Sequence, residues 1–350
     1  MRANTKQDLR VLVVRLGAMG DILHSMPAVT ALRQAHPEWT LGWAIEPQWE
    51  GLFCAGSGDA ESEAMPLVDR VHRVAAKRWA KSPLHPRTLG DIRRLRRELR
   101  EMQYDVAVDL QGAVRSAMVA RWAGTRRVLG EEQPREFAAK WLFDERVATR
   151  GVHVIEQSVE VVNAIAGDDL PTILPLLPRG SAAETRAERL QRPFVLLSPG
   201  AGWGAKRWPP QRYGAVAKGL ADAGYQVAIN CGPGEETLAE EIVRSSGGVA
   251  QSLKLAMADL IAVTRRASLV IAGDTGPLHL ACALDVPVVA IFGPTDPARN
   301  GPFHTPSRVL RHPQSVRDHS RRSEPEAGLL TITADAVTEA ARELLRERAR

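Results

Sequence analysis

Two glycine-containing loops in the C-terminal half of the chain combine residue types that bind phosphate groups. They lie within 271–280 (IAGDTGPLHL) and 292–297 (FGPTDP), and each follows an apolar run typical of a buried strand. In the first segment, Pro277 suits the opening position of a helix. A loop between a strand and a helix N-terminus directs backbone N–H groups at one point, which favours a phosphate or diphosphate. Asp274 in this loop either caps the helix or accepts hydrogen bonds from hydroxyl groups of a ligand.

A carboxylate also follows the first strand-like run of the chain. Asp21 closes the turn 17–21 (GAMGD), which comes after the apolar residues 9–16. In this place Asp21 either deprotonates an incoming hydroxyl as a general base or caps the helix that follows. The spacing of Gly17 and Gly20 is not that of the dinucleotide-binding fingerprint, and no such fingerprint occurs elsewhere in the sequence. This argues against a dehydrogenase.

Other ionisable residues occupy similar loops. Lys206 lies in the glycine-rich loop 198–209, where its ammonium either neutralises a phosphate leaving group or is only solvated. Glu235 and Glu236 follow Gly-Pro-Gly, where a carboxylate either holds ribose hydroxyls or interacts with the dipole of the next helix. We interpret His279, inside the helix after Asp274, as a packed or hydrogen-bonded structural residue.

The sequence motifs of several kinds of functional site are absent. Asp-x-Asp, His-x-His and Cys-x-x-Cys metal motifs do not occur, which favours a metal-independent mechanism. A Gly-x-Ser-x-Gly elbow and a P-loop lysine motif are also missing. The three cysteines, Cys54, Cys231 and Cys282, are odd in number and follow no metal-ligand spacing, so we expect reduced thiols.

Two series of alternating strand and helix patterns carry these loops. The strands expected in the first series are 9–16, 41–45, 71–74, 105–110 and 127–129. Those expected in the second are 194–197, 226–229, 269–272, 286–292 and 308–310. Such alternation predicts two Rossmann-like, doubly wound α/β domains with parallel sheets. Because ligands bind at the carboxyl ends of such strands, we expect all the glycine-rich loops to face one central cleft.

The length of 350 residues also suits two domains. We place an N-terminal domain at 1–166 and a C-terminal domain at 193–332. The segment between them, 167–192, is rich in Pro, Asp and Arg and is expected to be a linker. The last segment, 333–350, is expected to form a charged amphipathic helix.

Composition and charge narrow the function classes. An apolar share of 44% with 25% charged residues is ordinary for a globular protein. The polar start, residues 1–10, resembles no signal peptide, and no run approaches the ~20 apolar residues of a membrane span. We therefore expect a cytoplasmic protein.

The net charge is only +5, but it is unevenly distributed. Residues 70–100 hold eleven Lys or Arg against two acids, and apolar residues at helical spacing predict that most of these arginines face away from the core. The segment forms a solvated face, or it binds an anionic substrate, an anionic membrane surface or nucleic acid. No nucleic-acid-binding motif accompanies it, so nucleic acid ranks last.

Four segments together resemble glycosyltransferase family 9, the heptosyltransferases. They are 13–24 (VVRLGAMGDILH), the loop around 206–209 (KRWP), 273–280 (GDTGPLHL) and 292–297, and the resemblance covers nearly the whole chain in the right order. In the N-terminal half, three shorter segments resemble the type of family member that transfers heptose to Kdo. These are 77–79 (KRW), 109–116 (DLQGAVRS) and 134–136 (PRE).

The resemblance implies a GT-B fold and a defined reaction. Family members of this type transfer L-glycero-D-manno-heptose from ADP-heptose to the Kdo of Kdo-lipid A in lipopolysaccharide inner-core biosynthesis. They invert the anomeric centre and use neither a metal nor another cofactor. The expected setting is peripheral, at the inner face of the inner membrane, with a monomeric enzyme and no nucleic-acid partner.

The resemblance also assigns roles residue by residue. Asp21 and Lys206 would be catalytic, Asp21 as the base on the acceptor hydroxyl. The implied donor-binding residues are Gly200, Ala201, Lys206, Glu235, Glu236, Asp274, Thr275, Gly276 and His279. The implied acceptor-binding residues are Met19, Gly20, Lys77, Arg78, Arg115 and Arg135, whose cations suit the carboxylates and phosphates of the acceptor.

The chain departs from the family pattern at two places, and two other functions stay open. Residues 200–202 (GAG) stand where adjacent threonines are expected, and Gln157 replaces an expected arginine. One alternative is a family 9 transferase with a different nucleotide-sugar or acceptor. The other is a nucleotide-sugar epimerase of similar fold, which would turn over its substrate without an acceptor.

Overall fold

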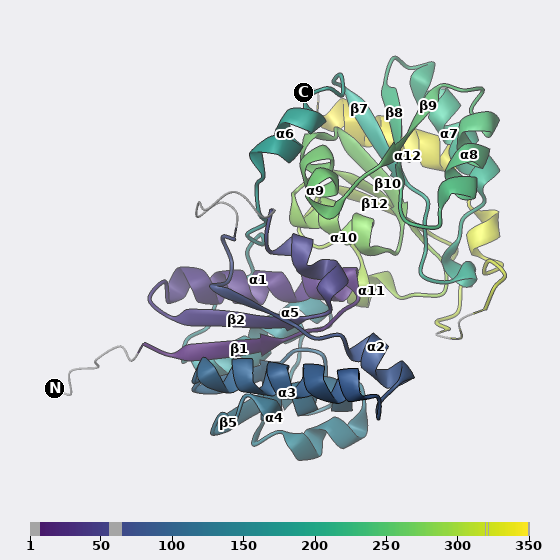
Figure 1. Ribbon diagram of the computed structural model, residues 1–350. Coiled ribbons are helices and arrows are strands. Elements are labelled where there is room, and N and C mark those ends of the chain that lie inside the picture. The colour runs from purple at the N-terminus through teal and green to yellow at the C-terminus, as the bar shows by residue number, and fades with distance from the viewer. Residues whose placement is uncertain (1–7, 56–64, 319, 321, 349–350) are drawn as a thin grey trace. The chain divides into compact units, whose positions relative to one another are not determined.

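The chain folds into two units, Met1–Pro178 and Arg179–Arg350, shown in the computed structural model of Figure 1. The structure describes residues 8–55, 65–318, 320 and 322–348. The division at Pro178 falls inside the segment predicted to be a linker. Part of that segment is the helix α6 (Ser181–Ala187), which packs against α9 (Met257–Arg266) of the second unit. Residues 1–7 of the polar start and the last two positions of the expected C-terminal helix lie outside the described residues.

Unit 1 is built on a six-stranded sheet in which every neighbouring pair is parallel. Its order is β3-β2-β1-β4-β5-β6. The strands are β1 (Arg10–Val14), β2 (Thr40–Ile45), β3 (Arg70–Arg73), β4 (Val106–Asp109), β5 (Arg127–Glu131) and β6 (Glu145–Val147). The central strands are apolar along their whole length because both faces are covered, as is usual for parallel sheets.

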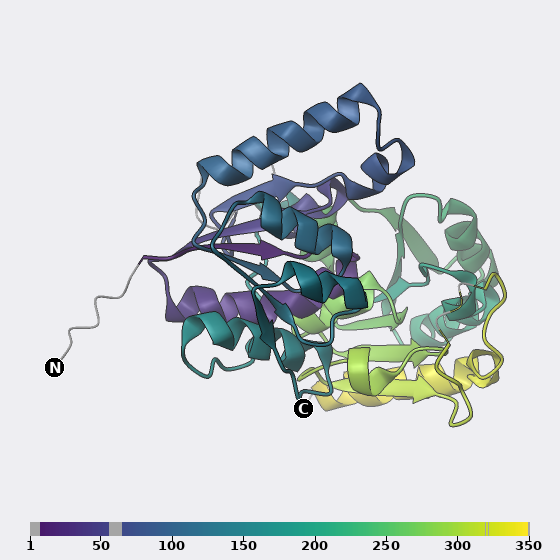
Figure 2. The ribbon, with the colours of Figure 1, turned by 90° about the horizontal axis from the view of Figure 1, so that it is seen from below.

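Helices cover both faces of this sheet. On one face α1 (Met19–Ala35) packs against α5 (Val154–Ala166). The opposite face holds a core to which α3 (Pro86–Glu101), α4 (Val114–Trp122) and the 3₁₀ helix η2 (Phe137–Leu142) contribute. In Figure 2, α1 in purple and α3 in blue lie on opposite sides of the strands. A further 3₁₀ helix, η1 (Pro47–Leu52), follows β2.

The basic stretch at residues 77–81 is not a loop. These residues belong to a short helix, α2 (Ala76–Lys81). The indole of Trp79 is buried in the core of unit 1, with its ring centroid 6.4 Å from that of Trp122. Burial of this one large side chain fixes the segment as a helical turn, which the run of charges around it concealed.

Unit 2 repeats the architecture with a second all-parallel sheet of order β12-β11-β10-β7-β8-β9. The strands are β7 (Phe194–Ser198), β8 (Gln226–Cys231), β9 (Ala250–Lys254), β10 (Leu269–Gly273), β11 (Val288–Phe292) and β12 (Ser307–Arg311). The helices are α7 (Pro210–Ala221), α8 (Glu236–Ser245), α10 (Gly276–Ala283), α11 (Pro297–Asn300) and α12 (Ala334–Arg348), with 3₁₀ turns η3 (Gly204–Lys206) and η4 (Leu329–Thr331). The predicted doubly wound α/β class is therefore confirmed for both units.

The C-terminal helix is part of the core of unit 2. α12 packs against α7, and five of its side chains join the buried cluster over β7, β8, β10 and β11. The expected amphipathic pattern arises because one face of the helix is buried and the other carries charges.

Each sheet has one point at which the strand order reverses. It lies between β1 and β4 in unit 1 and between β7 and β10 in unit 2. In doubly wound sheets, ligands bind beside the carboxyl ends of the strands at such switch points. Among the described residues, no helix is long and apolar enough to cross a membrane.

Candidate active site

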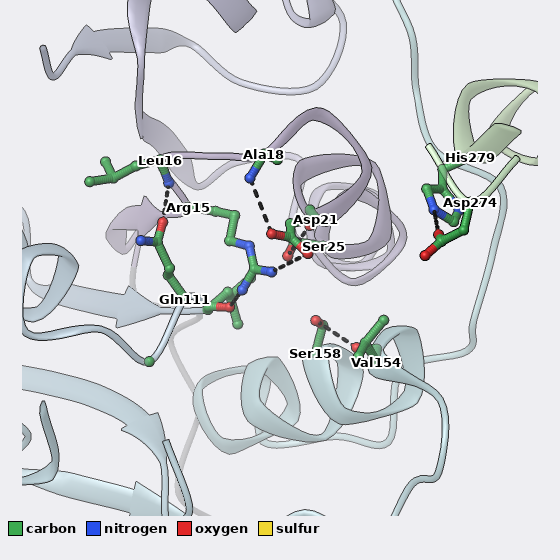
Figure 3. Close-up of polar contacts among 12 residues, drawn as sticks. Arg15, Leu16, Ala18, Asp21, Ser25, Gln111, Val154, Ser158, Asp274 and His279 are labelled. Carbon is green, nitrogen blue, oxygen red and sulfur yellow. Dashed lines mark hydrogen bonds and ion pairs between the residues drawn. The ribbon is translucent and has the colours of Figure 1, made fainter. Parts of the chain in front are cut away.

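The carboxyl ends of β1 and β4 place a carboxylate beside an arginine (Figure 3). Asp21, the third residue of α1, lies 3.1 Å through Oδ1 from Nη2 of Arg15, which follows β1 directly. Its Oδ2 accepts a 3.1 Å hydrogen bond from the N–H of Ala18, and Ala18, not Asp21, occupies the N-cap position. The Asp21 side chain is nevertheless 42% exposed. The carboxylate is thus oriented by two protein groups and still open to a substrate.

The loops after β1 and β4 are bonded to each other. Arg15 Nη1 donates to the carbonyl of Leu110, the first residue after β4. The buried Gln111 accepts a 2.8 Å hydrogen bond from the N–H of Leu16 through its amide oxygen (Figure 3). Asp21 therefore lies on a turn fixed by two adjacent strands at the switch point, which suits a group that must act at one defined position.

Asp109, the last residue of β4, organises the second of these loops. It is buried and accepts hydrogen bonds from the N–H groups of Gln111 (2.7 Å) and Gly112 (3.0 Å) and from the hydroxyl of Ser116 (2.8 Å). Burial raises the pKa of Asp109 to about 6, although these hydrogen bonds and the charge of Arg15 act in the other direction. Desolvation of Asp109 therefore disfavours its ionised form more than these partners stabilise that form.

The raised pKa of Asp109 predicts a stability that depends on pH. Because the folded protein binds this proton more tightly than the unfolded chain, the contribution of Asp109 to the free energy of unfolding falls by about 3 kcal/mol as the pH rises from about 4 to above 6. Asp109→Asn should remove this slope in urea unfolding across that range. The amide can keep the contacts, because its oxygen can accept from the two N–H groups and its NH₂ can donate to Ser116. An unchanged slope in Asp109→Asn, or an equal change in the exposed Asp105→Asn, would contradict the assignment.

The residues expected to bind the acceptor fall into three pairs. Met19 and Gly20 open α1 next to Asp21, with Met19 buried. Lys77 and Arg78 are exposed on α2, where Arg78 forms an ion pair with Asp91 of α3. Of these four residues, Met19 and Gly20 directly precede the candidate base in the first turn of α1.

Arg115 and Arg135 are exposed on two segments that are bonded together. The N–H of Glu136 donates to the carbonyl of Gly112 (2.8 Å), and its carboxylate accepts from the N–H of Val114 (2.9 Å). Gly112 has φ +65°, and a Cβ there would lie 2.8 Å from the backbone N of Arg135. This close approach requires a glycine, and it attaches the segment that carries Arg135 to the loop that begins α4 and leads to Arg115.

In unit 2 the carboxyl ends of β7 and β10 place a lysine on a buried carboxylate. Lys206 Nζ forms an ion pair with Oδ2 of Asp274. The same Nζ lies 3.3 Å from the carbonyl oxygen of Asp274 and 4.3 Å from the centroid of the Trp203 ring. The other carboxylate oxygen is 3.1 Å from His279 Nε2 (Figure 3). α10 begins at Gly276 with Thr275 as its N-cap, so Asp274 does not cap the helix.

The charges around Asp274 determine its protonation. Burial alone would raise the pKa of this carboxyl, but the hydrogen bond with His279 and the charges of His279 and Lys206 outweigh it and hold the pKa well below its usual range. Asp274 is therefore a carboxylate at any working pH. The interpretation of His279 as a hydrogen-bonded structural residue agrees with this geometry.

The two neighbouring glutamates after β8 have different surroundings. Glu235 is half-buried, accepts a 2.9 Å hydrogen bond from the N–H of Gly232, and lies against Gly200 of the loop after β7. A Cβ at Gly200 would overlap this carboxylate, so the Glu235 side chain can occupy this position only because residue 200 is a glycine. Glu236 is exposed and lies 3.6 Å from Lys254. Of the two, only Glu235 is next to the loop that leads to Lys206.

Comparison with known proteins identifies the family. The sequence profile of glycosyltransferase family 9 (heptosyltransferase) matches residues 92–328, more than half of the chain. The chain belongs to glycosyltransferase family 9. The resemblance drawn from the sequence motifs is therefore confirmed, and the protein is a glycosyltransferase.

This family 9 transferase has relatives of two kinds. It is 29% identical to the lipopolysaccharide heptosyltransferase 1 of Pseudomonas aeruginosa, over 84% of this chain and 81% of that protein. It is 27% identical to the lipopolysaccharide heptosyltransferase 2 of Salmonella typhimurium, over 97% of this chain and 99% of that protein.

Solved structures of the same family have the same fold. The E. coli heptosyltransferase WaaC with ADP superposes with a TM-score of 0.79 at 25% identity, covering 96% of this chain and 100% of that one. WaaC with ADP-2-deoxy-2-fluoro heptose gives a TM-score of 0.77 at 25% identity, over 96% and 99% of the two chains. The predicted GT-B-type α/β fold agrees with this likeness.

Sequence reasoning assigns no role to four side chains that shape the two candidate sites: Arg15, Asp109, Gln111 and Trp203. Arg15 and Asp109 could have been found from the sequence, since each is a charged residue at the end of a buried apolar strand. Asp21 was found from a similar position, a few residues after such a strand. Gln111 and Trp203 gave no such signal, because their contacts are with residues distant in sequence or in another turn of the loop. Within the described part of the chain, no three His, Cys, Asp or Glu side chains are grouped so as to hold a metal ion.

Proposed function

We propose that this glycosyltransferase transfers L-glycero-D-manno-heptose from ADP-heptose to the Kdo of Kdo-lipid A, with inversion, in lipopolysaccharide inner-core synthesis. The single observation that carries the reaction type is the half-exposed Asp21 carboxylate, oriented by Arg15 at the switch point of unit 1. The choice of donor is supported by WaaC, which was solved with ADP and with an ADP-heptose analogue. The choice of acceptor is supported by the relatives named heptosyltransferase 1.

In the proposed reaction Asp21 acts on the acceptor. Its carboxylate takes the proton of a Kdo hydroxyl as that oxygen attacks the anomeric carbon of the heptose. The bond between this carbon and the diphosphate oxygen breaks in the same displacement, so the configuration inverts and ADP leaves with the electron pair. Lys77, Arg115 and Arg135 would hold the carboxylates and phosphates of the acceptor.

Unit 2 would stabilise the leaving diphosphate. The first backbone N–H groups of α10, at Thr275 and Gly276, have no acceptor within the helix and lie at the positive end of its dipole. Lys206 adds a positive charge at the same switch point, held by Asp274. Negative charge develops on the diphosphate in the transition state, where such preorganised groups act without reorganisation. We therefore propose a metal-independent mechanism in which Glu235 holds the ribose hydroxyls.

An ADP-release assay tests this function. Purified enzyme with ADP-heptose should release ADP only when Kdo-lipid A is present, and the heptosylated lipid should be detectable by mass spectrometry. Glu235→Gln should raise the KM for ADP-heptose by roughly tenfold through the lost hydrogen bonds, whereas the exposed Glu236→Gln should change it less than twofold.

The outcomes separate the alternatives. ADP-heptose binding without ADP release on Kdo-lipid A, but with release on a later core acceptor, would move the enzyme to the reaction class of the heptosyltransferase 2 relatives. Conversion of the sugar nucleotide without any acceptor would indicate an epimerase. Failure to bind any ADP-sugar would overturn the donor assignment.

A further inference from the structure

One side of unit 1 carries an unusual combination of exposed side chains. α3, α4 and η2 all bury their inner faces in the same core against the sheet, so their outer faces lie on one side of the unit. We call this side the basic–aromatic face. Its exposed residues are Arg93, Arg96, Arg97 and Arg100 of α3, Arg115 and Met118 of α4, and Phe137 and Trp141 of η2.

The four arginines of α3 form one stripe. Their spacing of three, four and seven residues places them on the same side of the helix, where they line a surface pocket together with Glu101. None of the ion pairs found among the described residues involves them, whereas Arg94 on the same helix pairs with Asp91. Four neighbouring guanidinium groups repel one another, and an anionic surface would relieve this repulsion.

The aromatic part is exposed to a degree that folding alone does not explain. The side chains of Phe137 and Trp141, four residues apart, are 64% and 67% exposed, with ring centroids 5.7 Å apart. Lys140 Nζ lies 3.4 Å from the centre of the Phe137 ring, and Met118 on the adjoining α4 is 42% exposed. Aromatic rings beside cations are the composition of protein segments at the boundary between lipid headgroups and acyl chains.

We propose that the basic–aromatic face docks on an anionic lipid bilayer, with the α3 arginines on lipid phosphates and Phe137 and Trp141 at the headgroup boundary. Charge complementarity selects the occupant, because the stripe needs a surface of many anions and the rings need an adjoining apolar phase. The proposal extends the proposed function, whose acceptor is a lipid, by naming the face that meets the membrane.

Vesicle binding without substrate tests the proposal, so its failure is distinct from failure of the proposed reaction. Full-length protein should sediment with phosphatidylcholine vesicles that contain phosphatidylglycerol, should not do so with phosphatidylcholine alone, and should be released by salt. Arg93→Gln/Arg96→Gln/Arg97→Gln should weaken partition on the order of 100-fold. The matched control Arg189→Gln/Lys218→Gln/Arg244→Gln removes the same charge from exposed positions of unit 2 and should have little effect.

The aromatic contact has its own readout. Brominated lipids should quench tryptophan fluorescence of the bound protein, and Trp141→Phe should abolish most of this quenching while binding persists. Phe137→Ser/Trp141→Ser should weaken binding to anionic vesicles. The proposal would be overturned by equal binding to neutral vesicles, by equal losses in the arginine variant and its control, or by quenching that survives Trp141→Phe.

Discussion

Asp21→Asn is expected to reduce acceptor-dependent ADP release by roughly 10³-fold, within the range by which a positioned general base accelerates a reaction. The amide keeps the size of the side chain and can still accept the hydrogen bond from Ala18, but it cannot take a proton from the acceptor hydroxyl. The loss should therefore appear in kcat and leave donor binding unchanged, because the residues proposed to bind the donor belong to unit 2.

Two controls decide whether the loss is chemical. The side chain of Asp21 is 42% exposed, so the thermal midpoint of Asp21→Asn should stay close to that of wild type. Asp21→Glu keeps a carboxylate but displaces it, and it should retain more activity than the amide while remaining impaired. If Asp21→Asn transferred heptose at a rate near that of wild type, another group would have to be the base.

Replacement of Lys206 is expected to have the second largest effect. Lys206→Met should lower kcat by about 10²-fold or more, because the diphosphate loses a preorganised positive charge. It should also reduce the free energy of unfolding by about 3 kcal/mol, because Asp274 would keep His279 but lose its ammonium partner in a buried place. Lys218→Met, at an exposed lysine on α7, is the control and should change neither quantity.

A double-mutant cycle separates these two effects. Lys206→Met/Asp274→Leu removes both charges and should recover most of the stability that either single variant loses, but none of the activity. The pKa of Asp274, which lies below its usual range, gives the sign of the pH dependence of stability. Its contribution to stability is present above about pH 4, where an unfolded aspartate is ionised, and is lost as the pH falls below it. Additive losses in the double variant would mean that the two charges do not stabilise each other.

The sequence predicted the positions of the reactive groups better than their partners. Asp274 was found because it lies directly after a buried strand, and Asp21 because it closes the glycine-containing turn that follows one; the order of a doubly wound sheet brings such ends to a switch point. The pairing of Lys206 with Asp274 joins residues 68 positions apart, and no local pattern encodes it. The choice between Glu235 and Glu236 was likewise open, because it depends on the missing Cβ of Gly200 in a different loop.

Segments without a local signal were missed for related reasons. β9 has the sequence AQSLK, in which only Ala250 is buried, because the strand lies at the edge of its sheet. Its polar residues do not alternate with apolar ones as strand patterns require. α2 also lacks a local signal, because four of its six residues are Lys, Arg or Trp at short spacing, and the tertiary contact of Trp79 explains the helix.

The place of α12 has a consequence for the order of events during synthesis. The helix supplies Val337, Ala340, Ala341, Leu344 and Leu345 to the core of unit 2, whereas the sheet and helices of unit 1 are complete by Ala166. A ribosome must therefore translate nearly the whole chain before unit 2 can close its core, while unit 1 can fold as soon as it emerges. The half of the protein that carries Asp21 and the basic–aromatic face can thus be formed while unit 2 is still a nascent chain.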